Sequence, residues 1–208
     1  MSLLPSNVLY TPDEYLRLER QTVERHEYLD GQMYAVAGES LEHSTIVSNI
    51  NAILNYQLRG KPCRVLQPNM KVRSRLSTDP SATGLFSYPN CLVICGDPIF
   101  HDVHRDVLIN PQVIIEILSR STKAHDRGEK FARYRQIESF AEYLLVSQYR
   151  PSIEHFTRQP NGDWIMHPET SIEGSIVITS IGCKLDLAEV YDRIDFTDER
   201  PVIGPILT

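Results

Sequence analysis

The spacing of apolar residues changes along the chain, and its first third contains the clearest helical pattern. In residues 40–60 apolar side chains recur every three or four positions: Ile46, Val47, Ile50, Ile53, Leu54 and Leu58. Gly60 is typical of the position just after such a helix. A shorter helix is predicted to begin at Pro12, with Thr11 as its N-cap and Glu14 completing a capping box.

Short apolar runs without helical spacing predict strands in the rest of the chain. They occur at 63–67, 70–74, 90–96, 111–119, 141–147, 152–158 and 163–169, and 175–192 predicts a further strand or two and a short helical turn. Residues 24–37 predict a hairpin turning at Asp30 and Gly31, 77–89 a loop, and 126–140 a helix. Because strands and helices do not alternate strictly, we expect one α/β domain over 1–208, with a mixed central sheet flanked by helices.

Composition supports a globular domain and bears on its cellular location and on the state of its cysteines. The 208 residues are 41% hydrophobic and 23% charged. The chain contains no run of about 18 apolar residues, so no membrane span is predicted. Its first residues do not resemble a signal peptide, and we therefore expect a cytoplasmic protein. Cys91 and Cys95 fall in one predicted strand, about 13 Å apart, which is too far for both to bind one zinc ion. The four cysteines are therefore interpreted as free thiols.

Charge excludes one class of partner interaction. The net charge of −6 and the pI of about 5.6 are not those of a protein that coats DNA without regard to sequence. Basic residues nevertheless gather in 71–75 and in a second group: Arg120, Lys123, Arg127, Lys130, Arg133 and Arg135. Most of this second group is interpreted as a solvated helix face, with Glu129 paired to Arg133. Lys130 is the exception.

Glu116 interrupts an apolar run in the predicted strand 111–119. Side chains alternate along a strand, so Ile114, Glu116 and Leu118 share one face while the other face is wholly apolar. We therefore expect a central strand covered on both sides. A carboxylate buried there needs a partner, which can be a metal ion or an arginine or lysine. The sequence of this strand alone does not decide between a metal ion and a basic side chain as the partner of Glu116.

Three segments of the chain resemble the Uma-two family of bacterial proteins. They are HEYLDGQMY (26–34), PQVIIEILSRSTKAHDRGEKFARYRQI (111–137) and AEYLLVSQYRPSIEHFTR (141–158), within a likeness that runs from about Tyr10 to about Tyr191. That family is assigned to the restriction-endonuclease-like, PD-(D/E)xK superfamily. The resemblance implies a restriction-endonuclease-like core at about 10–191. It also implies a Mg²⁺- or Mn²⁺-dependent nuclease acting on nucleic acid, with DNA as the expected partner, and a homodimer.

The resemblance also implies catalytic and metal-binding residues. Glu116 corresponds to the metal-binding glutamate. Leu118 stands where the superfamily has its lysine, but the family pattern places a lysine on the following helix, at Lys130. Asn90 stands where the family has an aspartate, and its amide oxygen can still bind a metal without contributing charge. Glu27 corresponds to a recurrent acid and is a further candidate metal ligand. Alternatively, Glu27 is an exposed strand residue.

Other residues are weaker candidates. If Asn90 leaves the metal short of charge, Asp97 or Asp79 are possible additional acids. His43 is a candidate contact to phosphate or water, or simply a capping or polar-face histidine. Gln67 is predicted on a strand before the site and is a candidate to face the metal. Tyr134 lies one turn after Lys130 and could hold Lys130 or a phosphate, although an aromatic at this spacing is usually core. The histidines of 101–104 lack a spacing that suits a metal site.

Two classes of function remain open. In the first the protein is a metal-dependent nuclease that hydrolyses phosphodiester bonds, using Glu116, Asn90 and Lys130. In the second it keeps the nuclease fold and binds nucleic acid or a partner protein, with activity weakened or lost because of Asn90. A structural ion pair between Glu116 and Lys130 is a third possibility. For the first we expect Glu116 to face a cleft and the Lys130 amine to lie beside it.

Overall fold

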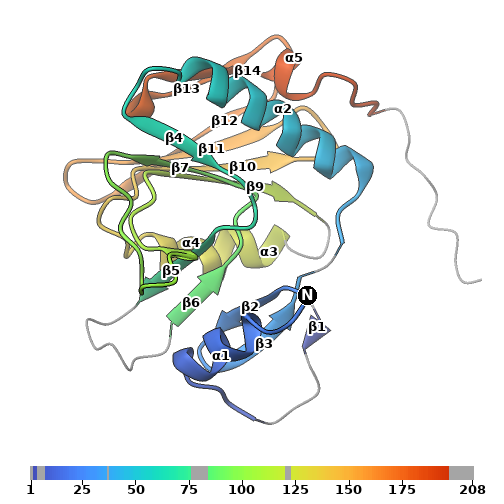
Figure 1. Ribbon diagram of the computed structural model, residues 1–208. Coiled ribbons are helices and arrows are strands. Elements are labelled where there is room, and N and C mark those ends of the chain that lie inside the picture. Colours follow the sequence, from blue (N-terminus) through green and yellow to red (C-terminus); the bar gives the residue numbers. More distant parts are fainter. Residues whose placement is uncertain (1, 4–7, 37, 76–83, 120–122, 197–208) are drawn as a thin grey trace, which may run out of the picture.

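A six-stranded mixed sheet forms the centre of the molecule, between two layers of other elements (Figure 1). The computed structural model describes residues 2–3, 8–36, 38–75, 84–119 and 123–196. In sheet order the strands are β12 (Trp164–Glu169), β11 (Ile153–Arg158), β10 (Glu142–Ser147), β9 (Val113–Leu118), β7 (Cys91–Cys95) and β4 (Cys63–Leu66). Only β9 and β10 run parallel, and the other neighbours are antiparallel.

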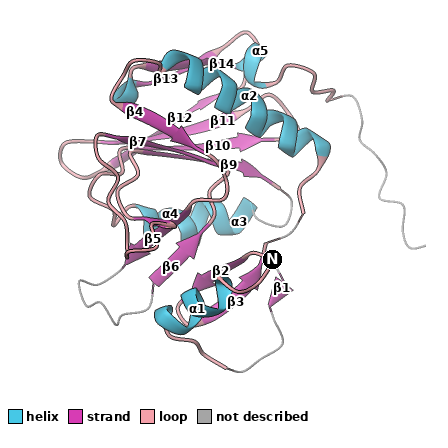
Figure 2. Ribbon diagram, in the orientation of Figure 1, coloured by secondary structure: helices cyan, strands magenta, loops and turns pink. Residues whose placement is uncertain are grey.

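The two faces of this sheet are covered by different elements. Val113, Ile115 and Ile117 of β9 pack toward α2 (Leu41–Gln57), the β13–β14 hairpin (Ser175–Ile178 and Cys183–Asp186) and α5 (Leu187–Val190). A 3₁₀ turn, η2 (Thr179–Ile181), joins the two hairpin strands. Ile114 and Leu118 pack on the opposite side against α4 (Phe131–Tyr134). The expected central strand with two covered faces is therefore confirmed (Figure 2).

A second six-stranded sheet lies beyond α4. Its order is β1 (Ser2–Leu3), β3 (Gln32–Ala35), β2 (His26–Leu29), β6 (Gly84–Ser87), β5 (Lys71–Arg75) and β8 (Val107–Leu108). Helix α1 (Pro12–Glu19) packs on it through Tyr15 and Leu16. Residues 88–90 connect β6 of this sheet to β7 of the central sheet. The connection meets the β2–β3 hairpin and the central strand β9 at one place, because the Tyr88 N–H bonds Glu27 of β2 and the Asn90 N–H bonds Glu116 of β9.

Local sequence signals account for the elements near that place. Thr11 and Glu14 form the predicted capping box of α1. Asp30 and Gly31, with φ of 46° and 97°, make the tight β2–β3 turn. A helical segment follows β9, made of α3 (Lys123–His125), the π-helical turn η1 (Asp126–Lys130) and α4. The sequence predicted this helix but not its widened turn.

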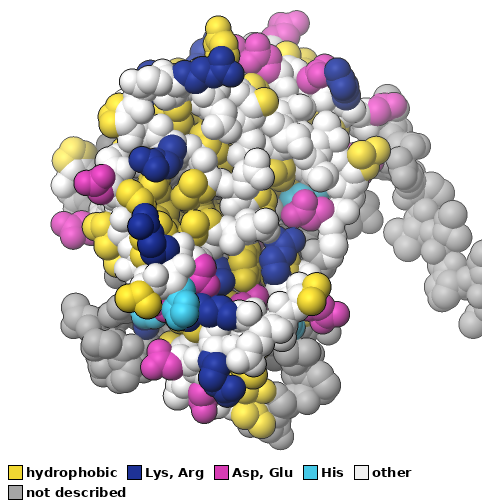
Figure 3. Space-filling model, in the orientation of Figure 1, with side chains coloured by type: hydrophobic (Ala, Val, Ile, Leu, Met, Phe, Trp, Pro, Cys, Tyr) yellow, Lys and Arg dark blue, Asp and Glu magenta, His cyan; other side chains and the backbone are white. Residues whose placement is uncertain are grey.

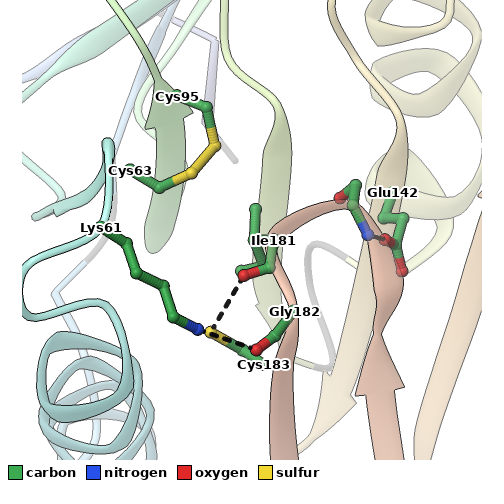
Figure 4. The surroundings of a disulfide bond; sticks show 8 residues. Lys61, Cys63, Cys95, Glu142, Ile181, Gly182 and Cys183 are labelled. Carbon is green, nitrogen blue, oxygen red and sulfur yellow. Dashed lines mark hydrogen bonds between the residues drawn. A yellow bond between two sulfur atoms is a disulfide. The ribbon is translucent and has the colours of Figure 1, made fainter.

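Two expectations from the sequence are wrong. Part of the loop predicted at 77–89 is a strand, β6, whose side chains are all buried. The cysteines are not all free, because Cys63 and Cys95 form a disulfide between β4 and β7 (Figure 4). Those strands pair antiparallel with Cys63 opposite Cys95, so the two side chains are neighbours despite a separation of 32 residues. Cys91 and Cys183 are free and buried.

Within the described part of the chain, no helix combines the length and the apolar character that crossing a membrane requires.

Candidate active site

A cavity of about 150 Å³ opens where the carboxyl end of β9 meets the start of α2 and the turn η1. Its wall is rich in carboxylates contributed by separate segments: Glu27 of β2, Glu39 just before α2, Glu116 of β9 and Asp126 of η1. Lys130 also lines it. Acidic side chains that converge from so many elements mark this cavity as the candidate site.

Glu116 is 3% exposed, and both of its oxygens have partners. Oε1 accepts from the Tyr134 hydroxyl at 3.2 Å and lies 3.3 Å from the Lys130 amine, while Oε2 accepts from the Asn90 backbone N–H at 3.3 Å. Burial raises the pKa of Glu116 to about 8, opposed by Lys130 and reinforced by the carboxylates of Asp126 and Glu27. Additional positive charge near Glu116 would therefore stabilise its ionised carboxylate.

Lys130 lies at the centre of three carboxylates. Its Nζ is 2.9 Å from Glu27 Oε1, 3.3 Å from Glu116 Oε1 and 3.3 Å from Asp126 Oδ1. Burial alone would lower the pKa of this amine, but the three carboxylates together raise it well above its ordinary value. The result is a fixed ammonium group with more negative charge around it than it can neutralise.

The turn η1 explains how one helical segment supplies several of these groups. Asp126, Lys130 and Tyr134 follow each other at intervals of four residues, and all three are buried. The π-helical turn covers the first two, and such widened turns often occur at functional sites. The hydroxyl of Tyr143, on β10, donates to the Asp126 carbonyl oxygen at 3.1 Å, which anchors the turn to the central sheet.

Asn90 and Glu27 complete the group. The amide oxygen of Asn90 accepts from the Ile117 N–H at 2.7 Å, and Asn90 also lines the cavity. Glu27 Oε1 accepts from the Tyr88 N–H at 3.0 Å. Glu27 Oε2 is buried and makes no hydrogen bond with the described residues. An acceptor of this kind is costly unless a cation or water meets it.

The donor set is compatible with a hard divalent cation. Among the described residues, no group of three or more His, Cys, Asp or Glu side chains is arranged to hold a metal ion. Mg²⁺, however, is commonly held by only one or two carboxylates and completes its octahedron with water. Glu116, Glu27 and the Asn90 amide offer oxygen atoms only, and Glu27 Oε2 lacks a partner. These three residues fit such an ion.

The family model described as "Putative restriction endonuclease", Uma2, matches residues 12–183. The chain belongs to the Uma2 family. Two uncharacterized proteins of Synechocystis sp. resemble it: one is 28% identical over 166 residues, covering 80% of this chain and 90% of the relative. The other is 31% identical over 187 residues, covering 89% and 93%.

A solved structure shares the fold of this Uma2 chain. It is titled as a "putative nuclease belonging to DUF820" from Anabaena variabilis, and the superposition gives a TM-score of 0.69 at 17% identity. The match covers 88% of this chain and 97% of the other. The restriction-endonuclease-like α/β class expected from the sequence is therefore confirmed.

Most of the candidates predicted for this Uma2 chain meet at the cavity. Glu116, Lys130, Asn90, Glu27 and His43 line it. Glu116 faces the cavity and the Lys130 amine lies beside it, as expected. Glu27 is not an exposed strand residue, since it is 3% exposed.

His43 and Tyr134 were each given a functional and a structural interpretation from the sequence. His43 is buried on the cavity wall and does not lie on a polar helix face, although its backbone N–H is bonded to the Ser40 cap. Tyr134 is fully buried in the core and still bonds Glu116 through its hydroxyl. Tyr134 is therefore both a core aromatic and a polar contact of the site.

Two candidates are not brought to the site. Gln67 follows β4, is exposed and is not part of the cavity wall. Asp97 is exposed on the loop after β7, and Asp79 lies outside the described residues. A further acid that lines the cavity beside Lys130 is Asp126, which the sequence pattern did not reveal. Its spacing of four residues from Lys130 was the available signal, but such a pair usually lies on a solvated helix face.

Proposed function

We propose that this protein is a metal-dependent nuclease that hydrolyses phosphodiester bonds of nucleic acid, with DNA as the first substrate to test and Mg²⁺ or Mn²⁺ as the cofactor. The observation that supports this most directly is the gathering of Glu27, Glu116 and Asp126 around Lys130 at a cavity wall. Membership of a family described as restriction endonucleases agrees with it.

The charge of the cluster supports a cation. Three carboxylates face one ammonium, and Glu27 Oε2 has no hydrogen-bond partner among the described residues. A group of buried ions with an excess of one sign is expected to take up a proton or a counter-ion. Burial, together with the carboxylates of Asp126 and Glu27, raises the pKa of Glu116 to about 8.

Each residue has a distinct part in this proposal. Glu116 and Glu27 would hold the cation through carboxylate oxygens, with Asn90 adding its amide oxygen. A bound divalent cation supplies Lewis acidity at the phosphate and lowers the pKa of a coordinated water. The Lys130 ammonium stabilises negative charge that develops on the phosphoryl oxygens, because it is fixed in place before the reaction. The Tyr134 hydroxyl orients Glu116.

Asn90 favours a second candidate function. Because an amide brings no charge, the protein could retain the fold and bind nucleic acid or a partner protein with little catalysis. Lys and Arg side chains on the face in Figure 3 lie in small separate groups among apolar, acidic and uncharged residues. Such a surface suits local contacts to a few phosphates better than extensive electrostatic binding.

Two expectations about context stay predictions. Homodimerisation is expected from the family resemblance. A cytoplasmic location was expected from the sequence, but the Cys63–Cys95 disulfide weighs against a reducing compartment.

Cleavage assays with matched lysine variants test the proposal. The protein is incubated with single-stranded DNA, double-stranded DNA and RNA in Mg²⁺, in Mn²⁺ or in EDTA. We expect cleavage with metal only, lost in Lys130→Met and kept in Lys123→Met, because Lys123 is an exposed lysine of the same helical segment. Nucleic-acid binding without cleavage in any metal would favour the second function. Equal cleavage by both lysine variants would contradict the proposed site.

A further inference from the structure

A histidine and a carboxylate face the same cavity from the α2 side. His43 is the third residue of α2, is 7% exposed and lines the cavity together with Glu116 and Lys130. The Ser40 hydroxyl accepts from the His43 N–H at 3.2 Å and donates to Gln148 Oε1 at 2.9 Å. The first turn of α2 is thereby tied to the residue that follows β10, and the ring of His43 is held at the cavity wall.

Glu39 is placed to orient this ring. Its Oε2 lies 3.4 Å from His43 Nδ1, within reach of an ion pair, and Nδ1 makes no hydrogen bond with the described residues. Contacts of this kind are often long in a protein without its substrate and shorten in the complex. With Nδ1 beside the carboxylate, Nε2 is the nitrogen that remains to meet a ligand. An imidazole oriented by a carboxylate is a common arrangement for proton transfer.

The other groups at the cavity are poor donors of a proton to a leaving oxygen. Of the remaining charged residues that line it, Glu27 and Glu116 would be ionised while they hold the cation, which leaves Asp126, a carboxylate paired with Lys130, and Lys130 itself. Three carboxylates raise the pKa of the Lys130 amine well above its ordinary value, so it gives up a proton reluctantly. Tyr88, which also lines the cavity, donates its hydroxyl to Glu19 Oε1, and its pKa is raised first by burial and then by Glu19.

We propose that His43 is the general acid that protonates the departing sugar oxygen, and that Glu39 is its positioning residue. This inference rests on the proposed nuclease function. In the reaction a bond forms between phosphorus and the oxygen of the attacking water, and the bond from phosphorus to the sugar oxygen breaks. The electron pair of the broken bond stays on the sugar oxygen, which takes the proton from His43 Nε2. The water releases one proton to solvent, and solvent returns one to His43.

The leaving group offers a direct test. A sugar alkoxide needs a proton to depart, whereas 4-nitrophenolate does not. The protein, His43→Ala and Glu39→Gln are assayed on single-stranded DNA and on the 4-nitrophenyl ester of thymidine 5′-phosphate, in Mn²⁺. His167→Ala is the matched control, because His167 is an exposed histidine on β12.

We expect a loss that depends on the substrate. General acid catalysis contributes about 10²- to 10⁴-fold, so kcat of His43→Ala on DNA should fall by about that factor while KM changes little. On the nitrophenyl ester kcat should stay within about threefold of the parent, because the acid is not needed there. Glu39→Gln should show a smaller loss in the same direction, and His167→Ala none. The thermal shift produced by Mn²⁺ should be the same in all four proteins.

Three outcomes would overturn the inference. Unchanged DNA cleavage in His43→Ala would remove His43 from the reaction, and an equal loss on both substrates would make its role structural. If His43→Ala does not fold, His43→Gln, which keeps a polar side chain of similar size, is measured and judged by the same ratio. A parent protein that cleaves neither substrate would instead refute the proposed nuclease function, and the assignment of His43 would fall with it.

Discussion

Two buried glutamates on neighbouring strands, Glu116 of β9 and Glu142 of β10, have opposite surroundings. Glu142 is 1% exposed and is bonded to hydrogen-bond donors, with His155 Nε2 at 2.5 Å and the Ser180 N–H at 2.6 Å. Burial would raise the pKa of Glu142, but these bonds outweigh it and lower the pKa below its ordinary value. Glu116 has one ammonium and two further carboxylates around it, and its pKa is raised to about 8.

The difference separates a structural carboxylate from a binding carboxylate. Glu142 carries its own donors and uses them to attach the turn η2, through Ser180, to the central sheet. Glu116 shares its ammonium partner, Lys130, with Glu27 and Asp126, so the group as a whole has capacity for more positive charge. A buried acid therefore indicates a site when its neighbours are also acids, and indicates a structural contact when they are donors.

The largest effect we expect is on activity, from Glu116→Ala. Losing partners outside the first coordination shell costs metal sites about 10- to 100-fold, and a metal ligand should cost more. Metal-dependent cleavage should therefore fall by more than about 100-fold. The fold should survive, because Lys130 keeps the carboxylates of Glu27 and Asp126 beside it.

Cleavage rates of Glu116→Ala measure the loss of activity, and thermal unfolding measures whether the fold is kept. An alanine variant that cleaves as well as the parent would show that any activity comes from elsewhere.

Glu142→Ala should have its main effect on stability. The His155 ring and the Ser180 N–H would each lose a buried acceptor, at a cost of about 1–3 kcal/mol for each unsatisfied donor. Urea unfolding measures this loss. The Mn²⁺-dependent thermal shift should be unchanged, since Glu142 is not part of the cavity wall. A Glu142→Ala variant that loses metal binding but not stability would show that Glu142, and not only Glu116, is a binding carboxylate.

The same two residues should impose opposite pH dependences on stability. Between the ordinary glutamate pKa of 4.5 and about 8, the unfolded chain releases the Glu116 proton while the folded protein keeps it. The free energy of unfolding therefore falls as pH rises through this range. Glu142 has a lowered pKa in the folded protein, so its contribution is present above pH 4.5 and is lost as the pH falls below it.

Urea unfolding in EDTA, from pH 4 to pH 9, resolves these contributions in Glu116→Gln and Glu142→Gln. Relative to the parent, Glu116→Gln should gain stability as pH rises to about 8 and then stay level. Glu142→Gln should lose stability near neutral pH and lose less below pH 4.5. A Glu116→Gln difference that does not change with pH would mean that burial and the neighbouring carboxylates do not raise the pKa of Glu116.

The sequence predicted the parts of the site that depend on local pattern. Glu116 stood out because it interrupts an alternation of apolar residues, and its position on a central strand followed from that alternation. The family resemblance then supplied Lys130. The hairpin carrying Glu27 was predicted from Asp30 and Gly31, although its burial was left open because burial depends on which element packs against the strand.

What the sequence did not predict depends on register and on distant packing. Cys63 and Cys95 pair only because β4 and β7 are antiparallel with those two residues opposite each other. Asp126 looked like a surface residue because nothing local shows that η1 faces the cavity. Gln67 was misplaced because β4 ends one residue before it.

Asn90→Asp should sharpen the contrast further by adding a carboxylate to the acidic site. The new side chain can still accept from the Ile117 N–H, so the backbone contact is kept. Two unit charges 4 Å apart interact by about 4 kcal/mol at an effective dielectric constant of 20. A part of that, about 1.4 kcal/mol, would lower the Kd for Mn²⁺ about tenfold.

Repulsion from Glu116 should make the metal-free variant less stable, and metal should restore more stability than in the parent. Thermal unfolding over a series of Mn²⁺ concentrations compares the two proteins. The same metal dependence in both would place Asn90 outside the metal site, and activity that stays absent would favour the non-catalytic function.

The smallest effect we expect comes from Tyr134→Phe, which removes one donor from Glu116. The Tyr134 hydroxyl bonds Glu116 Oε1 at 3.2 Å and Ser87 Oγ at 2.7 Å, while Lys130 remains beside the carboxylate. A hydrogen bond of this kind contributes about 0.5–1.5 kcal/mol, so Mn²⁺ affinity and cleavage should change about two- to tenfold. Tyr143→Phe is the matched control, because its hydroxyl bonds the Asp126 carbonyl and not the Glu116 carboxylate. Calorimetric titration of both variants should show a larger change in Mn²⁺ affinity for Tyr134→Phe at a similar loss of stability. Equal changes would mean that Lys130 and the Asn90 N–H orient Glu116 without Tyr134.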